Sequence, residues 1–362
     1  TNFEMATKTN FYKLQVKEII KETEDCISIS FDVPEGHMQD FTFKAGQYLT
    51  LKTKVKDEEV RRSYSLCSEP SSNKHKIAIK KIENGLFSTF AHDHVKRGDV
   101  LEVMPPSGNF QHIPDYGAKK NYVLFAAGSG ITPILSIVKS ILRHEPDSNV
   151  NLVYGNKGVH TIIFREEIEA LKNKYLHRFS VVHILSRENL GNDLQKGRID
   201  KEKCIRLLDA YFRENTIDDV FICGPEKMTL DIREVMLSKG LQSSQIHLEL
   251  FGTGYDKKVQ KIKKSTPNPN DSTVILYIDG DEFEFKLNNQ GASILDTAQK
   301  SGLDVPYACK GGVCCTCKAK VLDGSVEMDV NYSLEQDELD RGYILTCQAH
   351  PTSEKVIVTF DE

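Results

Sequence analysis

The stretch V-P-Y-A-C-K-G-G-V-C-C-T-C, residues 305–317, carries cysteines at the spacing C-x4-C-x2-C. These are Cys309, Cys314 and Cys317, and a fourth, Cys347, follows in Y-I-L-T-C-Q-A-H. Plant-type 2Fe-2S clusters are held by cysteines at this spacing. Structural zinc sites favour two short-spaced pairs of Cys or His ligands instead. The spacing therefore predicts a 2Fe-2S cluster, with zinc as the weaker alternative.

Two neighbouring features fit a loop that wraps around an inorganic core. Gly311 and Gly312 lack a Cβ, so the backbone can reach positive φ and approach the cluster closely. Cys315 breaks the ligand spacing. We expect its thiol to fill a small buried space, the alternatives being ligand exchange or redox sensing.

The bulk properties indicate a multidomain protein of ordinary composition. The chain has 362 residues, of which 39% are hydrophobic and 27% charged, and this length suggests two or three domains. There is no apolar run as long as a membrane span and no signal-peptide pattern at the start. The other five cysteines show no pairing pattern, so the cytoplasm is the expected compartment. Neither charge nor aromatic pattern supports nucleic-acid binding.

Charge is distributed unevenly along the chain. Residues 274–362 hold 16 acidic and 7 basic side chains, a charge of −9, so the first 273 residues carry +4 of the total of −5. The acidity is either an ordinary solvated surface or a docking face for a basic partner. Acidity clustered between the third and fourth cysteines slightly favours docking, at Glu327, Asp329, Glu335, Asp337, Glu338 and Asp340.

Residues 8–113 are predicted to form an antiparallel β-barrel, because short strands alternate with turns. The expected strands include 12–20, 26–33, 48–53, 76–82 and 100–104. Within this region R-R-S-Y-S-L, residues 61–66, combines an arginine suited to a pyrophosphate with a tyrosine that can stack on a ring system. E-N-G-L-F-S-T-F, residues 83–90, could offer Gly85, Ser88 and Thr89 to the same phosphates at a helix start, or form an ordinary helix cap.

Residues 114–254 change to a pattern of alternating strands and helices, which predicts a doubly wound parallel α/β sheet. A buried strand at 122–126 is followed by A-A-G-S-G-I-T-P and an apolar helix at 134–142. Strand, Gly-x-Gly loop, a Thr cap and Pro in the first turn predict an anion site at a helix N-terminus. Pro133 stands where the dinucleotide fingerprint has its third glycine.

Two segments of this domain are candidates for nucleotide contacts. Ser186 and Arg187 directly follow a strand, where an arginine suits a 2′-phosphate and favours NADPH, although the adjacent Glu188 keeps NADH possible. Arg198 could add a second positive charge or form a surface ion pair. F-I-C-G-P-E-K-M, residues 221–228, places Cys223 and Gly224 at the carboxyl end of another strand, where such sheets bind ligands.

A lysine-rich segment at 255–272 reads as a mobile linker, and we expect the last module, 273–362, to swing on it between two positions. Shortening the linker would test this expectation, because an unchanged activity of the protein would contradict it.

In order, R-R-S-Y-S, G-L-F-S, A-A-G-S-G-I-T-P, F-I-C-G-P-E-K-M and L-E-L-F resemble the ferredoxin-NADP reductase superfamily over nearly the whole chain. The C-terminal module is similar to a plant-type ferredoxin, which implies an α+β (β-grasp) fold. A flavin module, a nicotinamide module and a terminal ferredoxin together are the layout of oxygenase reductases.

The resemblance assigns roles to the matched positions. It implies that FAD is bound by Arg62, Tyr64, Ser65, Gly85, Phe87, Ser88 and Thr89, with Tyr64 stacked on the isoalloxazine and Ser65 near N5. It implies that the dinucleotide meets Gly128, Gly130, Thr132 and Gly224, with Ser186, Arg187 and Arg198 at its phosphate end. Cys223 would lie beside the nicotinamide, and Glu249 and Phe251 near the other flavin face. A domain follows Phe251 here, where the family has a free terminal aromatic, so this residue is the least secure.

The implied function is electron transfer from NADPH, or NADH, through FAD and the cluster to an oxygenase. FAD accepts two electrons together and passes them on one at a time, while the protein supplies positioning and tuning. A diiron oxygenase of the phenylacetyl-CoA type is the first candidate for the partner. A reductase for a Rieske-type or other oxygenase is the alternative, and a redox-sensing flavo-iron-sulfur protein is a more distant one.

Overall fold

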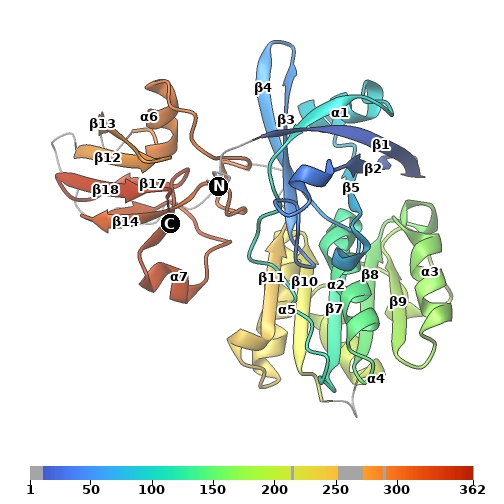
Figure 1. The fold of residues 1–362 in the computed structure, drawn as a ribbon. Helices are drawn as coiled ribbons and strands as arrows, with labels where there is room; N and C mark the ends of the chain where they lie inside the picture. The colour runs from blue at the N-terminus through green and yellow to red at the C-terminus, as the bar shows by residue number, and fades with distance from the viewer. Residues whose placement is uncertain (1–10, 213–215, 252–271, 288–290, 362) are drawn as a thin grey trace.

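The computed structural model describes residues 11–212, 216–251, 272–287 and 291–361. Figure 1 shows three units along the chain: a blue β-barrel, a green and yellow α/β sheet below it, and an orange and red module beside the barrel. Residues 8–10 of the predicted barrel domain lie outside the described residues. So does the predicted linker, except Ser272, which begins the first strand of the last module.

The first unit is a six-stranded antiparallel sheet in the order β4-β3-β6-β1-β2-β5. A bridge between Leu66 and Ile77 joins the end of β4 to β5 and closes the sheet into the predicted barrel. Its elements are β1 (Tyr12–Thr23), β2 (Cys26–Asp32), β3 (Tyr48–Val55), β4 (Glu58–Ser65), β5 (His75–Lys80), α1 (Leu86–Asp93) and β6 (Val100–Val103).

Strand β4, which carries the R-R-S-Y-S motif, was not among the strands expected from the sequence. It pairs with β3 in a tight hairpin whose two turn residues, Lys56 and Asp57, both have positive φ. Two consecutive positive φ values are typical of a type I′ hairpin turn, for which the usual signal is Asn-Gly or Asp-Gly. Because the turn has no glycine, this hairpin signal is missing from the sequence. The register sets Tyr48 opposite Ser65 and Leu49 opposite Tyr64.

The second unit is a five-stranded parallel sheet in the order β11-β10-β7-β8-β9, as the alternating pattern predicted. Apolar side chains of α2 and α3 pack on one face of the sheet, and those of α4 and α5 pack on the other. The elements are β7 (Asn121–Ala127), α2 (Ile131–His144), β8 (Asn149–Asn156), α3 (Arg165–Lys174), β9 (Phe179–Leu185), α4 (Lys201–Tyr211), β10 (Asp219–Gly224), α5 (Glu226–Ser238) and β11 (Ile246–Leu250).

The third unit is a mixed five-stranded sheet in the order β13-β12-β18-β14-β16, with a separate pair β15-β17. Strands β12 and β18 run parallel, while the other neighbours in the five-stranded sheet are antiparallel. The elements are β12 (Ser272–Ile278), β13 (Asp281–Leu287), α6 (Ile294–Lys300), β14 (Lys318–Asp323), β15 (Val326–Met328), α7 (Gln336–Asp340), β16 (Tyr343–Leu345), β17 (Ala349–Pro351) and β18 (Lys355–Thr359). Helix α6 packs into the module's own core.

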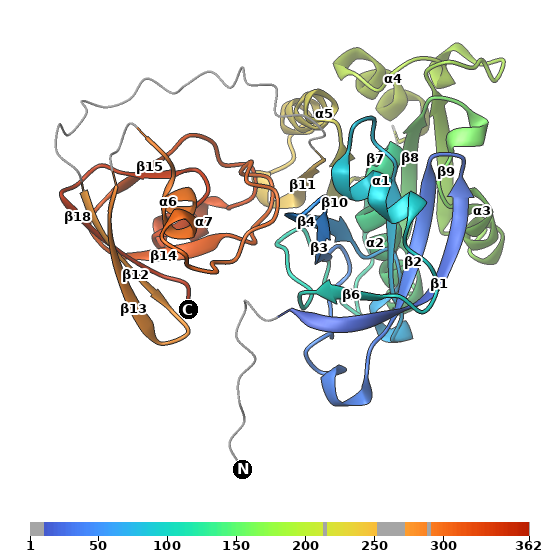
Figure 2. The same ribbon diagram turned by 90° about the horizontal axis from the view of Figure 1, so that it is seen from above.

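Figure 2, seen from above, places this module beside the strand pair β3–β4. The long loop between α6 and β14, which contains Cys309, Cys314 and Cys317, faces that pair, as the contact of Tyr48 with Ala308 and Cys314 shows. No helix in the described part of the chain is long and apolar enough to cross a membrane.

Candidate functional site

The R-R-S-Y-S motif and the start of α1 lie next to each other on the barrel. The rings of Tyr64 and Phe87 are 5.5 Å apart between centroids and tilted by 42°. Arg62 is exposed on β4, and one of its guanidinium nitrogens donates to the carbonyl of Arg61 at 2.7 Å. An exposed cation beside a helix N-terminus and a half-buried aromatic ring fit the phosphate and ring portions of a flavin dinucleotide.

Helix α1 begins after Gly85, which has no side chain to cap it. The hydroxyl of Ser88 is buried and makes local bonds instead: it accepts from the Ile82 N–H at 3.2 Å and donates to the Gly85 carbonyl at 3.4 Å. Both interpretations of this segment are therefore compatible with the geometry. Ser88 stabilises the turn, while the unpaired N–H groups of a first helical turn can meet a phosphate.

The Gly-x-Gly loop forms a short 3-10 turn, η3 (Gly128–Gly130), between β7 and α2. Gly128 has φ +55°, and a Cβ on Gly130 would lie 2.2 Å from the carbonyl oxygen of Cys223. The prediction of a Thr cap was wrong. Helix α2 starts at Ile131, and the Thr132 hydroxyl donates back to the Ser129 carbonyl at 3.0 Å from within the first turn. The helix therefore begins two residues earlier than a cap at Thr132 would place it.

Ser65 of β4 and Cys223 of β10 both lie against the carboxyl group of Glu249 on β11. Ser65 Oγ donates to Glu249 Oε2 at 3.3 Å, and Cys223 Sγ donates to the same oxygen at 3.9 Å. Burial raises the pKa of Glu249 to about 8, although both hydrogen bonds oppose the rise. Burial also raises the pKa of the Cys223 thiol, and the nearby Glu249 adds to the effect. At neutral pH this cluster holds a proton on the carboxyl and one on the sulfur.

The remaining predicted residues of this region lie at the same edge. Gly224 ends β10, and its carbonyl accepts the Phe251 N–H at 3.2 Å, which keeps the chain beyond β11 next to Cys223. Parallel α/β sheets bind ligands at the C-terminal ends of their strands, and Glu249, with its raised pKa, lies there next to the barrel. A flavin and a nicotinamide would meet at this position.

The residues expected at the nucleotide phosphate are also brought together. Lys196 bridges to Leu185 at the end of β9, so Arg198 comes close to Ser186 and Arg187. The Gly197 N–H donates to the Leu185 carbonyl at 2.9 Å and fixes this approach. The side chains of Arg187 and Arg198 are exposed and available to an anion.

The Glu188 carboxylate is bound by other groups and not by the two arginines. It accepts the Val159 N–H at 3.1 Å and lies 3.4 Å from His160 Nδ1. The residue that kept NADH open from the sequence is thus engaged with the loop after β8.

The four predicted cluster cysteines lie as two pairs. Cys314 Sγ is 3.1 Å from Cys309 Sγ, and Cys317 donates to Cys347. In each pair the donated hydrogen bond lowers the pKa of the accepting thiol, Cys309 or Cys347. Among the described residues no three metal-binding side chains converge on a single ion position. Two thiol pairs suit a centre with two irons, each taking two thiolates.

Backbone and amide donors support the sulfurs from outside. The Gly311 N–H donates to Cys309 Sγ at 3.2 Å, and Gln348 Nε2 donates to Cys347 Sγ at 3.6 Å. Hydrogen bonds to thiolates are among the features that set the potential of such a cluster. Cys315 lies outside both pairs: its thiol donates to the Ser333 carbonyl at 3.4 Å, and burial raises its pKa to about 11.

Three family models match the chain. They are an oxidoreductase FAD-binding domain over residues 13–112, an oxidoreductase NAD-binding domain over 124–234, and a 2Fe-2S iron-sulfur cluster binding domain over 276–352. The solved structure of phthalate dioxygenase reductase has the same three-part fold, with a TM-score of 0.58 at 24% identity, covering 97% of this chain and 98% of that one.

Curated relatives match over nearly their full lengths. One subunit of the 1,2-phenylacetyl-CoA epoxidase of Escherichia coli strain K12 is 42% identical over 354 residues, 98% of each chain. The ferredoxin reductase component of 3-ketosteroid-9-alpha-monooxygenase from Mycobacterium tuberculosis is 33% identical over 97% of this chain and 96% of its own. The glycine betaine monooxygenase reductase subunit of Pseudomonas aeruginosa is 29% identical over 94% of this chain and 93% of its own.

Fold, sites and relatives together define the class as a three-domain oxidoreductase that binds FAD, a pyridine nucleotide and a 2Fe-2S cluster. The chain belongs to the ferredoxin-NADP reductase family, among the reductase components that carry a C-terminal ferredoxin domain. It passes electrons from the nucleotide through FAD to the 2Fe-2S centre for an oxygenase.

Two residues at the contact between the barrel and the ferredoxin domain, Tyr48 and Arg61, were not predicted from the sequence. Both contact the ferredoxin domain from the barrel. The only available signal was the doubled arginine in R-R-S-Y-S: neighbouring residues of a strand point to opposite faces, so only one of the two can face the flavin.

Proposed function

We propose that this reductase takes electrons from NADPH and delivers them to a diiron oxygenase of the phenylacetyl-CoA type. The partner rests on the 42% identity to the epoxidase component over 98% of both chains. A second partner class, another monooxygenase, is favoured only by more distant relatives at 33% and 29% identity.

The preference for NADPH rests on the grouping at the end of β9. Arg187 and Arg198 are exposed beside Ser186, while Glu188 is held by the Val159 N–H. The two arginines can bind the 2′-phosphate of NADPH, and the Glu188 carboxylate is held elsewhere and does not repel it. NADH has only a 2′-hydroxyl at this position.

The proposed roles divide between the strands that meet at the flavin. Ser65 and Glu249 hold and move a proton near the flavin ring, Tyr64 covers one face of the ring, and Cys223 lies on the nicotinamide side. Arg62, Gly85, Phe87, Ser88 and Thr89 surround the FAD phosphates, and Gly128, Gly130 and Thr132 approach the dinucleotide. Cys309, Cys314, Cys317 and Cys347 bind the irons. Phe251 completes the edge next to Gly224.

The compartment that we propose is the cytoplasm. The nine cysteines, all of them among the described residues, are free thiols, as a reducing environment keeps them.

One anaerobic experiment tests the chain of electron carriers and its partner. NADPH or NADH is added to the purified protein while flavin and cluster absorbance are followed, and the reduced protein is then mixed with a phenylacetyl-CoA diiron oxygenase. Bleaching of both chromophores, faster with NADPH, and coupled product formation are expected. Bleaching without product would remove the proposed partner, and equal rates with the two nucleotides would remove the NADPH preference.

The phosphate site is tested separately. Arg187→Gln and Arg198→Gln should each lower kcat/KM for NADPH by about tenfold, which corresponds to about 1.4 kcal/mol, and leave the value for NADH within about twofold. Lys201→Gln, a nearby exposed lysine paired with Glu234, serves as the control.

A further inference from the structure

The ferredoxin domain touches the barrel through its cysteine loop. Tyr48 on β3 is 4% exposed, and its ring packs against Ala308 and Cys314. Its hydroxyl lies 3.1 Å from Thr316 Oγ1. Since Tyr48 stands directly opposite Ser65 in the β3–β4 register, this contact connects the cysteine loop to the strand that carries the proposed flavin residues.

Arg61 makes a second contact across this boundary. It is 4% exposed, and its guanidinium donates to Asp304 Oδ1 at 2.7 Å and lies 4.4 Å from the ring centroid of Tyr307. It also pairs with Glu59 of its own hairpin at 2.8 Å. A buried arginine with a charge-assisted hydrogen bond and an aromatic face on the partner side fixes orientation as well as contact.

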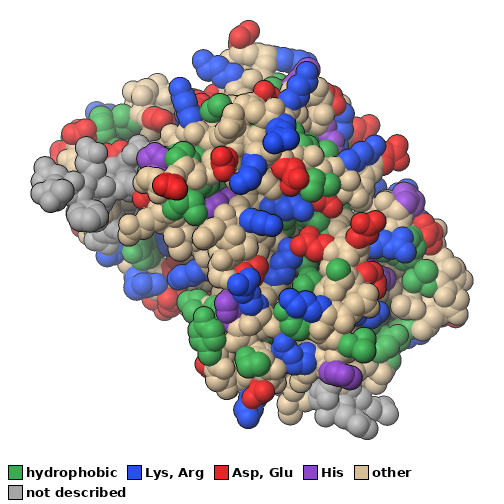
Figure 3. Space-filling view, turned by 45° about the vertical axis from the view of Figure 1, so that its right-hand side comes forward, with side chains coloured by type: hydrophobic (Ala, Val, Ile, Leu, Met, Phe, Trp, Pro, Cys, Tyr) green, Lys and Arg blue, Asp and Glu red, His purple; other side chains and the backbone are tan. Residues whose placement is uncertain are grey.

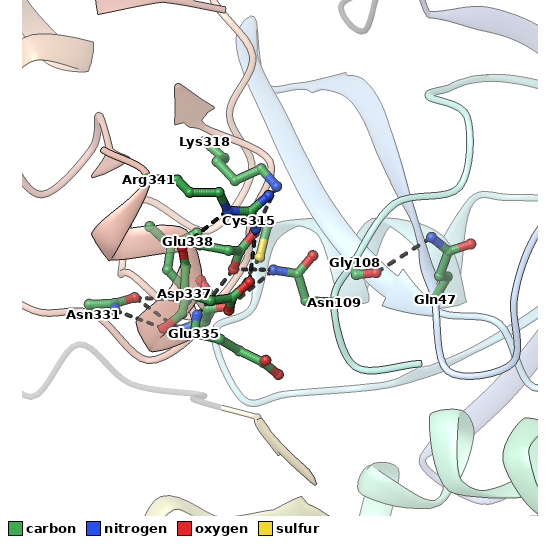
Figure 4. Close-up of polar contacts among 12 residues, drawn as sticks. Gln47, Gly108, Asn109, Cys315, Lys318, Asn331, Glu335, Asp337, Glu338 and Arg341 are labelled. Carbon is green, nitrogen blue, oxygen red and sulfur yellow. Dashed lines mark hydrogen bonds and ion pairs between the residues drawn. The ribbon is translucent and has the colours of Figure 1, made fainter. Parts of the chain in front are cut away.

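A third contact between the two domains involves Asn109 and Glu338. Figure 4 shows Asn109, from the loop after β6, reaching Glu338 of α7. Asn109 Nδ2 donates to Glu338 Oε2 at 2.7 Å, and Lys318 holds the other carboxylate oxygen at 2.9 Å. Glu338 is 7% exposed, so this member of the acidic group predicted to meet an external partner is already bound within the chain.

The two sides of the Arg61–Asp304 contact differ in what remains of it when the ferredoxin domain departs. Asp304 is 70% exposed in its side chain, so water replaces Arg61 around its carboxylate when the ferredoxin domain departs. Arg61 keeps Glu59 and a second aromatic ring, Phe11, 5.0 Å from its guanidinium, when the ferredoxin domain departs. The barrel side is therefore a prebuilt receptor, whereas the ferredoxin side is an exposed acid beside an aromatic ring.

We propose that Arg61, Tyr48 and Asn109 form a reversible docking site for the cysteine loop and helix α7 of the chain's own ferredoxin domain, and that the Arg61–Asp304 pair sets how long the loop stays against the flavin-carrying strands. The proposal rests on the proposed electron-transfer function. Arg61, Tyr48 and Asn109 act as positioning residues. A boundary of a few polar contacts around one tyrosine resembles a transient interface, which lets the domain release after each electron.

The first test needs no turnover. In the full-length Arg61→Lys protein, a carbodiimide should join the new amine to Asp304, and peptide mass spectrometry should find the cross-linked pair. Asp304→Asn in the same background should abolish it. The absence of a cross-link between positions 61 and 304, with others formed normally, would overturn the docking site.

The second test separates docking from barrel stability. After rapid flavin reduction by NADPH, stopped-flow absorbance should show cluster reduction slowed about tenfold in Arg61→Gln and in Asp304→Asn, with flavin reduction itself unchanged. The double variant should be no slower than either single one, because both remove the same pair. Additive losses, or a wild-type rate in the exposed Asp304→Asn variant, would contradict the proposal.

Matched controls are Lys17→Gln, from an exposed ion pair on the barrel, and Asp281→Asn, on the ferredoxin surface. Both should keep the wild-type rate. Failure of the wild-type protein to reduce its cluster at all would instead remove the proposed function.

Discussion

The raised pKa of the Glu249 carboxyl predicts how the stability of the protein changes with pH. Burial raises this pKa to about 8 from the 4.5 of an unfolded chain. Between these values the folded protein keeps a proton that the unfolded chain has lost. Its contribution to stability is therefore full below about pH 4.5 and is lost as pH rises to about 8, by at most about 1.4 kcal/mol per pH unit.

Glu249→Gln should flatten this slope, because glutamine does not titrate. Thermal unfolding of the full-length protein at intervals from about pH 5 to about pH 8 measures it. Glu284→Gln, at an exposed position, should keep the wild-type slope. Parallel curves for Glu249→Gln and wild type would show that the carboxyl is ionised throughout.

The Cys315 thiol is not expected to be a cluster ligand. It lies outside both cysteine pairs and burial raises its pKa to about 11, so it is a poor nucleophile at neutral pH. Cys315→Ala should keep the visible absorbance and the electron paramagnetic resonance signal of the reduced cluster, whereas Cys314→Ala should lose both. Loss of the cluster in Cys315→Ala would mean that the ligand set has been misassigned.

Among the elements, the turn from β7 to α2 is constrained by the neighbouring strand β10. A methyl group at Gly130 would lie 2.2 Å from the Cys223 carbonyl oxygen, while one at Gly128 would meet nothing within 4 Å. Gly130→Ala should therefore cost about 3 kcal/mol or more and abolish nucleotide binding, because the backbone must shift.

Gly128→Ala is the matched control for this turn. Gly128 has φ +55°, so an alanine there pays only the cost of a left-handed conformation, about 1–2 kcal/mol. Urea unfolding and NADPH titration compare the two variants. Equal losses would indicate that conformation, rather than the contact with β10, decides the turn.

At the scale of the whole molecule, the barrel and the α/β sheet are joined by a buried polar contact. His112 Nε2 lies 3.0 Å from Glu145 Oε1 at the end of α2, and Glu145 is fully buried. The T-shaped pair of Phe110 and Phe221 adds an apolar contact beside it, with ring centroids 5.8 Å apart. These contacts join the barrel to the α/β sheet.

Glu145 makes this junction sensitive to acid. Burial works to raise its pKa, but hydrogen bonds from His112 and Ser148 outweigh it and the net pKa is lowered. A lowered carboxyl pKa contributes stability that is present above the unfolded value of 4.5 and lost as pH falls through the folded value.

Glu145→Gln should lower the free energy of unfolding at neutral pH by about 1–3 kcal/mol, and the difference from wild type should shrink below about pH 4.5. Urea unfolding of both proteins at neutral pH and below about pH 4.5 measures this difference in the free energy of unfolding. Asp147→Asn, at the exposed Lys119–Asp147 pair, should have little effect. A constant difference at both pH values would assign the loss to packing.

The surface of the molecule carries charges of both signs. On the face drawn in Figure 3, lysine and arginine side chains are interspersed with aspartate and glutamate. Between the barrel and the ferredoxin domain, Arg61 and Asp304 form an ion pair at 2.7 Å.

The sequence by itself determined the features that depend on neighbours along the chain. Cysteine spacing predicted the loop, the strand–glycine–helix order predicted the turn after β7, and alternation predicted the parallel sheet. Each is set by local backbone geometry or by the periodicity of burial. Strand β4 was missed because its turn residues, Lys56 and Asp57, reach positive φ without glycine.

Only the tertiary structure decided which distant side chains meet. Glu249 faces Ser65 across 184 residues, and Arg61 faces Asp304 across 243. Barrel closure, strand order and domain docking bring these pairs together, and none of these leaves a periodic signal in the sequence. The shifted pKa of Glu249 arises for the same reason, since burial is a property of the assembled fold.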